Sequence, residues 1–193
     1  KGVALQTGSK VAWEEAFSGF PYDKYGYDKY FDIATEGVNV HLNTFVDEFD
    51  VEKSRLRIKD DWHSYDILVS TISPEIILKK CYGDLRWAGR DFMKIILPVE
   101  HALPPHVHFL YYANNEPYTR IVEYKKYYKN KHPYTLLGIE IPDNTKNKLY
   151  PFPMKKDQDL HKKYTDSLPD NVINLGRNAQ YRYYDMGGTI GQG

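Results

Sequence analysis

The chain has 193 residues, of which 41% are hydrophobic and 27% charged, with 26 basic and 26 acidic side chains. This length suits one domain of roughly 150 residues, or one domain and a small addition. Aromatic residues make up 15% of the chain, so a packed core can form and wholesale disorder is excluded. Zero formal net charge removes the electrostatic case for a nucleic-acid or anionic-membrane partner. No apolar run approaches the roughly 20 residues that span a bilayer.

Cysteine content and the two chain ends indicate where the protein works and how complete it is. The single cysteine, Cys81, cannot form an internal disulfide and excludes a Cys-based zinc cluster, so we expect a cytoplasmic protein. We expect Cys81 itself to be a small buried residue. The chain opens on Lys1 without a methionine or a signal-peptide pattern, and it closes on what reads as the first turn of a helix. A piece of a longer chain is therefore expected, with a processed protein as the alternative.

The first half of the chain alternates turn-rich segments with short periodic ones. Residues 1–16 carry little periodicity and are predicted to be an arm or linker. Apolar residues at helical spacing between Tyr27 and Ala34, followed by Gly37, predict a helix. Ser73 before Pro74 predicts a helix start. Alternating or β-branched runs predict strands at residues 38–43, 56–58 and 65–70.

From Asp91 onward the pattern favours strands. The candidates, separated by Pro-containing or polar turns, are residues 92–97, 106–112, 118–124 and 135–141. Consecutive strands with short connections favour an antiparallel meander. Apolar residues at four-residue steps predict a surface helix over residues 155–168, and a short buried strand is predicted over residues 172–175.

Two clusters of residues could indicate a metal site and a nucleic-acid-binding surface, but the rest of the sequence favours neither. His106 and His108 would share one face of a strand, as a metal-binding pair can, but no third ligand is evident and we predict no metal site. The run from Lys125 to Tyr134 alternates cations with tyrosines, as in proteins that stack single-stranded nucleic acid. The neutral net charge favours a solvated hairpin there instead.

The C-terminal stretch carries the most unusual chemistry. Asp185 is a candidate helix N-cap, and Gly187 and Gly188 just inside the helix would let a ligand approach free backbone N–H groups. Such N–H groups bind phosphates and other electron-rich atoms, although an ordinary capped helix accounts for the pattern equally well. No G-x-G-x-x-G, Walker, G-x-S-x-G or H-E-x-x-H motif occurs in the sequence.

The residues of this stretch resemble the UDP-galactopyranose mutases, flavoenzymes that interconvert UDP-galactopyranose and UDP-galactofuranose. GRNAQYRYYDM at residues 176–186 is similar to the family signature GRxGxYRYxDM. Three weaker matches follow the family order, and they are FSGFP with GY at residues 17–27, YTRIVEYK at 118–125 and YPF at 150–152. Departures include Tyr124 where the family usually has His, Asn-Ala-Gln at 178–180, and the two glycines after Met186.

The resemblance implies a set of substrate-binding residues. These are Arg120, Tyr150, Tyr183 and Asp185. Arg120 would also be the catalytic residue, because guanidinium offers forked, permanently charged donors to the diphosphate of the leaving UDP. The alternative is a surface ion pair of Arg120 with Glu123 or Glu116, and core packing for the tyrosines.

The resemblance also implies reduced FAD as the cofactor, contacted by Arg177, Asp185 and Met186. It covers the chain from about Phe17 but only the later half of the family enzyme. The N-terminal βαβ unit with its glycine fingerprint, which holds the ADP part of FAD, is missing. We therefore expect that this chain alone does not retain FAD.

These observations predict an α+β protein in which a mostly antiparallel sheet with flanking helices forms a substrate-binding domain. That domain would span residues 17–168, and residues 169–193 would be the C-terminal strand and helix start of an FAD-binding domain. The predicted function is that of a mutase fragment acting on UDP-galactose in cell-surface polysaccharide synthesis, inactive by itself. The alternatives are a non-catalytic sugar-nucleotide-binding module and an amine-oxidase-type flavoprotein. Strands that lack their partner domain leave association-prone edges, so a homodimer is also expected.

Overall fold

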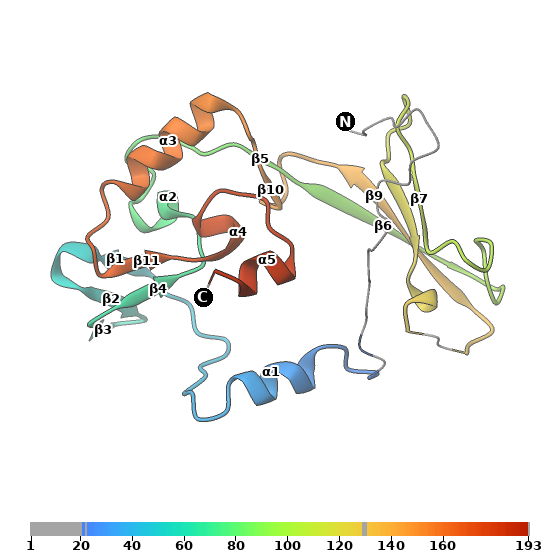
Figure 1. Ribbon diagram of the computed structural model, residues 1–193, viewed down its shortest axis with the longest axis horizontal. Helices are drawn as coiled ribbons and strands as arrows, with labels where there is room; N and C mark the ends of the chain where they lie inside the picture. The colour runs from blue at the N-terminus through green and yellow to red at the C-terminus, as the bar shows by residue number, and fades with distance from the viewer. Residues whose placement is uncertain (1–20, 22, 129–130, 193) are drawn as a thin grey trace. The chain divides into compact units, whose positions relative to one another are not determined.

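The computed structural model describes residue 21 and residues 23–128 and 131–192 (Figure 1). The chain forms two compact units, each built from two stretches of sequence. Unit 1 comprises residues 1–40 and 91–142, and unit 2 comprises residues 41–90 and 143–193. The division into domains at residue 169 refers to a longer enzyme and stays a prediction, as does the arm at residues 1–16, which lies outside the described residues.

Unit 1 is organised around a four-stranded sheet with the order β6-β9-β8-β7. Its strands are β6 (Arg90–Leu97), β7 (Phe109–Tyr111), β8 (Arg120–Glu123) and β9 (Thr135–Pro142). The antiparallel pairs β7–β8 and β8–β9 follow the predicted meander, but β6 lies beside β9 and not beside β7, so the prediction of a simple meander is wrong for the first strand. The two eight-residue strands thereby lie together, whereas β7 has only three residues.

The predicted solvated hairpin after β8 is also wrong where the structure describes it. Residues Tyr124–Lys126 form the 3-10 helix η2, and Lys125 is only 7% exposed. The Lys125 ammonium donates to the carbonyl of Glu100 at 2.7 Å and to that of His132, and Lys126 donates to the carbonyls of Leu103 and Val107 at 2.6 and 2.8 Å. Both cations therefore hold loops together and are not a free basic surface.

Glu123 anchors the loop between β6 and β7. Its side chain is fully buried and accepts hydrogen bonds from the backbone N–H groups of Ala102 and Leu103, both at 2.9 Å. The Thr135 hydroxyl donates to the same carboxylate at 2.7 Å, and the Lys126 ammonium lies 3.1 Å away. Burial alone would raise the pKa of Glu123, but these donors outweigh it and lower the pKa to about 2.

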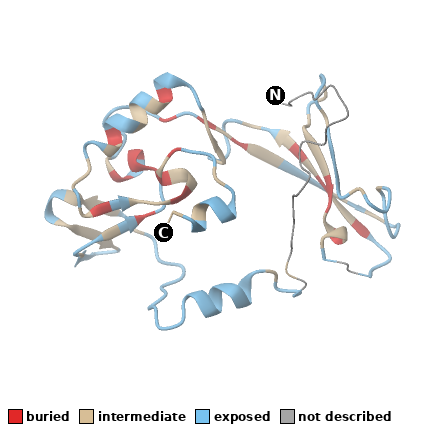
Figure 2. Ribbon diagram, viewed as in Figure 1, coloured by how far each residue is buried: buried red, intermediate tan, exposed pale blue. Residues whose placement is uncertain are grey.

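Unit 1 also contains a helix that packs little. Helix α1 (Asp28–Ala34) confirms the helix predicted there, but none of its residues is buried (Figure 2). The strand predicted over residues 38–43 is absent, and Val38, Val40 and Leu42 are 61%, 54% and 79% exposed. Alternation makes a strand only where another strand offers hydrogen bonds, and among the described residues no strand lies beside this segment.

Unit 2 combines three small sheets with short helices. Strands β1 (Glu48–Asp50), β2 (Arg55–Ile58) and β3 (Asp61–Ser64) are antiparallel, with η1 (Val51–Lys53) between the first two. Strand β5 (Trp87–Ala88) pairs antiparallel with β10 (Tyr150–Pro151), and β4 (Leu68–Ser70) pairs parallel with β11 (Val172–Asn174). The helices are α2 (Pro74–Ile77), α3 (Lys155–Thr165), α4 (Gly176–Ala179) and α5 (Met186–Ile190). The predictions of β2, β11, α3 and the α2 start are confirmed.

The core of unit 2 lies between α2, α3 and the β5–β10 pair (Figure 2). It consists of Leu85, Trp87, Tyr164 and Tyr181, each at most 5% exposed. The Tyr164 hydroxyl donates to the carbonyl of Gly83 at 2.6 Å and accepts from the Tyr82 amide at 3.1 Å, which satisfies its polar end. Cys81 lies in the turn after α2 and is exposed, so the prediction of a buried cysteine is wrong.

An ion pair between a buried carboxylate and a half-exposed guanidinium joins α3 to the segment before β5. Asp157 is 2% exposed and accepts from both forks of the Arg86 guanidinium, at 2.7 Å to Nε and 2.5 Å to Nη2. The hydrogen bond from Arg86 holds the pKa of Asp157 below its usual value, against the effect of burial. This bidentate contact fixes the position of α3 relative to β5.

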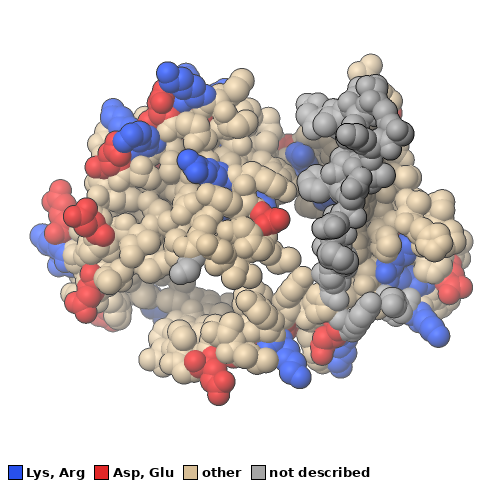
Figure 3. Space-filling model, viewed as in Figure 1, with Lys and Arg blue, Asp and Glu red and all other residues tan. Residues whose placement is uncertain are grey.

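The predicted fold class is confirmed, because the sheets are mostly antiparallel and the helices are few. In the part of the chain that the structure describes, no helix has the length and apolar character needed to cross a membrane. Acidic and basic side chains both occur on the visible face of each unit (Figure 3), and the chain carries 26 of each kind.

We predict that Glu123→Gln destabilises the chain at neutral pH by about 3 kcal/mol, the value that follows from lowering a carboxyl pKa from 4.5 to about 2. Because the folded-state pKa is the lower one, this stabilisation is present above pH 4.5 and is lost as the pH falls toward 2. Urea unfolding followed by circular dichroism between pH 2 and 7 measures it. Glu36→Gln, at an exposed position, is the control. Parallel pH profiles for the parent and Glu123→Gln would contradict the assignment.

Candidate functional site

The site in unit 2 begins with a glycine that turns the chain out of a strand. Gly176 follows β11 and Leu175 and has φ +81°, a left-handed conformation that favours glycine. A helix of only four residues, α4, starts there and sets Arg177 on its first turn. This explains why a glycine precedes the arginine in the family-like Gly-Arg pair. The glycine permits the turn after which Arg177 lies in the first turn of α4.

Arg177 is anchored by backbone carbonyls of two different segments. Its Nε donates to the carbonyl of Tyr184 at 3.0 Å, Nη2 donates to the same oxygen, and Nη1 donates to the carbonyl of Leu149 at 3.3 Å. These bonds hold residues 181–186 against the segment that leads into β10. The residue predicted to contact a cofactor is thus also an organiser of the site.

Two tyrosines stack beside this guanidinium. The rings of Tyr150 and Tyr183 lie 5.6 Å apart at an angle of 21°. The central carbon of Arg177 lies 4.4 Å from the ring of Tyr183 and 5.6 Å from that of Tyr150. The guanidinium carbon of Arg90, a residue of unit 2 at the start of β6, lies 5.1 Å from the ring of Tyr150. Cation–π contacts of this kind contribute roughly 0.5–2 kcal/mol each, so the two phenols are held as a pair.

The stacked tyrosines line a cavity of about 460 Å³ in unit 2. Its other lining residues are Pro151, Pro153, Gln158, Tyr181 and Arg182. Pairing of β10 with β5 places Tyr150 opposite Ala88, which fixes one wall. Tyr183 is 64% exposed, so its side chain is accessible to a ligand. The cavity offers phenol hydroxyls, one guanidinium and one amide to an entering molecule.

Asp185 and Met186 lie at the start of α5. The Asp185 carboxylate accepts from the Gly188 amide at 2.7 Å, which confirms the predicted N-cap. A Cβ added at Gly187 would meet only this carboxylate within 4 Å, at 3.7 Å, so the outer side of the first turn is open. Met186 is 64% exposed. Both residues are therefore accessible, and the capping role of Asp185 is in place without a ligand.

Arg120 belongs to unit 1, where it is the middle residue of a cross-strand row. Strand pairing sets Tyr111 opposite Arg120 on β7 and Glu140 opposite it on β9. Arg120 Nε donates to Glu140 Oε1 at 2.8 Å, Nη2 donates to the same atom, and Nη1 donates to the Tyr111 hydroxyl at 3.4 Å. The aromatic rings of Phe109 and Tyr111 lie 5.9 and 5.6 Å from the guanidinium carbon.

The alternative ion pairs of Arg120 with Glu123 or Glu116 are not formed, since its partner is Glu140. Strand alternation places Glu123 on the opposite face of β8, where it is buried. Burial of the Arg120 guanidinium opposes its charge, but the hydrogen bond and negative charge of Glu140 outweigh this and raise the pKa of Arg120 above its ordinary value. Arg120 is thus a fixed, permanent cation.

The structure brings together Arg177, Tyr150 and Tyr183, and places Asp185 and Met186 a few residues further along unit 2. The resemblance also implies that Arg120 and Tyr183 lie close together on one concave face, and this stays a prediction. Sequence reasoning missed Glu140, Tyr111 and Arg90, whose roles depend on which strands are neighbours. A single charged residue in the apolar run 135–141 was the one available signal for Glu140.

The histidines suggested as a metal pair do not share a strand. His106 and His108 both precede β7, and His108 packs its ring 5.1 Å from that of Tyr127. Among the residues that the structure describes, no group of three or more His, Cys, Asp or Glu side chains could hold a metal ion.

The fold is mixed α/β with mostly antiparallel sheets, and unit 2 carries a cluster of Arg177, Tyr150 and Tyr183. Comparison with known proteins gives its family. The family model described as UDP-galactopyranose mutase matches residues 1–183, so the chain belongs to the UDP-galactopyranose mutase family, a family of isomerases. The resemblance read from residues 176–186 is confirmed.

A solved structure supports the same fold. The chain is similar to a crystal structure of reduced UDP-galactopyranose mutase, with a TM-score of 0.65 and 16% sequence identity. The match covers 85% of this chain and 47% of that one, so the chain spans about half the length of the solved mutase.

We predict that Arg177→Lys loosens the segment of residues 181–186, because an ammonium cannot reproduce the forked contact with the carbonyls of Tyr184 and Leu149. The expected loss of stability is about 1–3 kcal/mol. Faster hydrogen exchange in peptides covering residues 181–186 is the direct readout. Arg182→Lys, at the exposed neighbouring arginine, serves as the matched control. Equal exchange in the two variants would show that Arg177 does not anchor this segment.

Proposed function

We propose that this chain supplies the diphosphate-binding part of an enzyme that interconverts UDP-galactopyranose and UDP-galactofuranose, a cytoplasmic step toward cell-surface polysaccharide. Membership of the mutase family supports the proposal. The observation that carries it is the pair of phenols, Tyr150 and Tyr183, stacked beside the anchored guanidinium of Arg177 and lining one cavity. The substrate is a UDP-sugar, with UDP as the leaving group.

The two phenols act on the phosphates. A phenol hydroxyl donates a hydrogen bond to an anionic oxygen, and such charge-assisted bonds are stronger than neutral ones. Both rings line the same cavity, so two hydroxyl donors are available to a diphosphate with several oxygens. Because stacking and Arg177 hold the rings, little side-chain entropy is lost when the substrate binds.

Arg120 supplies the permanent charge. Glu140 occupies the Nε–Nη2 edge of the guanidinium, while the Nη1 side faces Tyr111. Nη1 carries a second N–H beside the one that it donates to Tyr111, and this N–H is the donor for the leaving diphosphate, with Glu140 orienting the guanidinium. As the bond between the sugar and UDP breaks, negative charge grows on the diphosphate, so a fixed cation stabilises the transition state more than the ground state.

FAD fits this chain only in part. The open first turn of α5, with Asp185 and Met186 exposed, suits the approach of a flavin edge, and Arg177 keeps N–H groups beyond those bound to carbonyls. The donors that would hold the adenylate end belong to a glycine fingerprint that the sequence does not contain. When bound and reduced, the flavin supplies the nucleophile for the anomeric carbon.

We predict that Arg120→Ala in the full-length enzyme that contains this chain lowers kcat/KM by roughly ten- to a hundredfold, which corresponds to about 1.5–3 kcal/mol for a charge-assisted contact. Part of the loss should appear in kcat, because the leaving group gains charge in the transition state. Arg120→Lys should recover little activity, since an ammonium cannot keep the two-nitrogen contact with Glu140 and also donate to the diphosphate from a separate nitrogen. Steady-state assays of UDP-galactofuranose conversion by chromatography measure both variants.

The matched control is Lys94→Ala, at an exposed cation on β6. If Arg120→Ala and Arg120→Lys behave like the parent, Arg120 has a structural role and the proposed diphosphate clamp is wrong. UDP binding without any conversion by the full-length protein would favour the non-catalytic binding module instead.

We further predict that the 193-residue chain alone binds UDP but does not retain FAD, because the contacts with the adenylate end are missing from its sequence. Absorbance near about 450 nm, the ordinary flavin band, should be lost from the protein after gel filtration with added FAD. Fluorescence titration with UDP provides the positive control for folding. A stoichiometric flavin band after gel filtration would contradict the prediction.

A further inference from the structure

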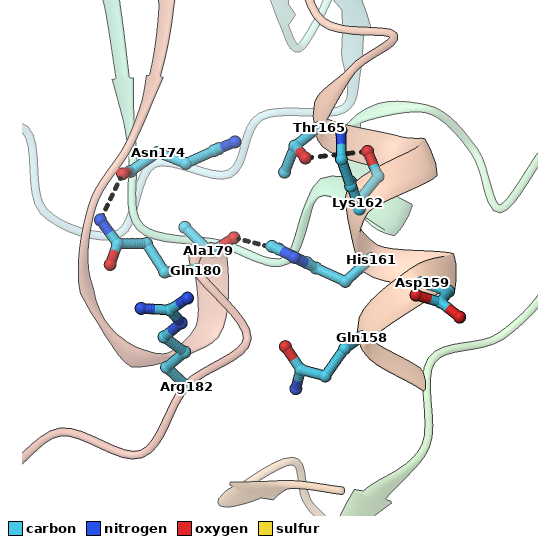
Figure 4. A pocket seen from close by; sticks show the side chains of 9 residues that line it. All are labelled: Gln158, Asp159, His161, Lys162, Thr165, Asn174, Ala179, Gln180 and Arg182. Atoms are coloured by element: carbon cyan, nitrogen blue, oxygen red, sulfur yellow. Dashed lines mark hydrogen bonds between the residues drawn. The ribbon is translucent and has the colours of Figure 1, made fainter. Parts of the chain in front are cut away.

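Helix α3 reaches the C-terminal segment with two side chains that lie one turn apart. The His161 ring nitrogen Nε2 lies 2.8 Å from the carbonyl oxygen of Ala179, the last residue of α4 (Figure 4). The Gln158 amide donates to the carbonyl of Tyr181 at 3.3 Å. Gln158 and His161 line a cavity of about 430 Å³ that also has Arg182 in its wall. Gln158 and Arg182 line the cavity of the stacked tyrosines as well, so the two cavities adjoin.

The carbonyl of Ala179 needs the donor that His161 supplies. Ala179 is 0% exposed, so water does not reach its oxygen. Helix α4 has only four residues, and the last carbonyls of a helix have no partner within it. Because a buried carbonyl without a donor is costly, the hydrogen bond from His161 stabilises the end of α4 and ties it to α3.

This contact determines the tautomer of His161. A carbonyl oxygen can only accept, so Nε2 carries the proton. Burial lowers the pKa of His161, the backbone hydrogen bond opposes this, and the charge of Arg182 lowers the pKa further, so the ring is neutral at pH 7. The other charged side chains around the cavity are Asp159 and Lys162 of α3, and Lys162 is bound by Asp166 at 2.6 Å.

The same ring supports the turn that follows α4. His161 stacks on the ring of Tyr181 at 5.5 Å and an angle of 19°. Tyr181 has φ +50°, a conformation that non-glycine residues keep only where other contacts maintain it. The next two residues, Arg182 and Tyr183, are exposed, and Tyr183 stacks on Tyr150 in the candidate site. His161 therefore contacts the turn from which Tyr183 projects both by a hydrogen bond and by its ring.

We propose that His161 is a positioning residue for the candidate site. Its imidazole, protonated at Nε2, fixes the turn at residues 179–181 and thereby places Tyr183 beside Tyr150 and Arg177. The proposal rests on the proposed function in one respect, since Tyr183 is one of the two phenols proposed to bind the diphosphate. The position of Tyr183 can be measured without a ligand, so the two proposals are tested separately.

The test compares three variants with the parent 193-residue chain. His161→Phe keeps a ring that stacks on Tyr181 but removes the donor, whereas His161→Gln removes the ring and supplies an amide donor. His63→Gln, at an exposed histidine on β3, is the matched control. The NMR resonances of the Tyr183 ring protons report its stacking on Tyr150, because each ring shifts the resonances of the other.

We expect NMR spectra of the imidazole nitrogens to show the Nε2–H tautomer of His161 at pH 7. In His161→Phe, the Tyr183 ring resonances should move toward those of an unstacked tyrosine. Amide exchange over residues 179–184 should become about tenfold faster, and UDP should bind about tenfold more weakly, as for the loss of one hydrogen bond. His161→Gln should recover most of each effect, and His63→Gln should match the parent.

The Nδ1–H tautomer in the parent would overturn the proposal, as would unchanged Tyr183 resonances in His161→Phe. A change that His161→Gln does not reverse would also overturn it, because the donor would then not be what holds the turn. If Tyr183 moves in His161→Phe while UDP affinity is unchanged, His161 is structural only. Absence of UDP binding by the parent would instead contradict the proposed function, since the tautomer, exchange and ring resonances do not involve UDP and still decide whether His161 places Tyr183.

Discussion

Tyr181 is the residue on which the arrangement of unit 2 depends. It is fully buried, its hydroxyl donates to the carbonyl of Arg86 and accepts from the amide of Phe152 at 3.2 Å, and its ring meets Trp87 edge to face at 4.9 Å. Both strands of the β5–β10 pair are thereby fixed to the C-terminal segment. Because Tyr181 also has a positive φ of 50°, the chain turns at this point, and the tertiary contacts sustain a conformation that non-glycine residues seldom adopt.

The turn at Tyr181 explains why consecutive residues serve different purposes. Tyr181 points into the core, whereas Arg182 and Tyr183 are exposed and line the two adjoining cavities. Arg177 then closes the loop from the other end by binding the carbonyl of Tyr184. The family-like stretch from Gly176 to Met186 is therefore a folding element as well as a candidate site, since its buried tyrosine and anchored arginine hold the exposed residues in place.

Local structure could be predicted from the sequence where a residue determines the conformation of the few residues next to it. The Pro74 helix start and the Asp185 cap depend on the intrinsic preferences of those residues, and the structure contains both. Residues 38–43 show the limit of such reasoning, because alternation cannot reveal whether a partner strand exists. Likewise, Lys125 looks like a solvated cation until the carbonyls of distant loops surround its ammonium.

The candidate site residues could be predicted only from their match to the family motif. The residues that contact them follow only from the register of the strands, which the sequence does not show. Glu140 stands next to Arg120 because β9 follows β8 antiparallel, so a residue twenty positions away orients the guanidinium. A one-residue slip in this pairing would move Glu140 to the opposite face of the sheet. The buried Glu123 opposes such a slip, since it fixes the other face of β8 to Thr135 at the start of β9. The structural carboxylate of Glu123 on one face of β8 thus preserves the register that pairs Arg120 with Glu140 on the other.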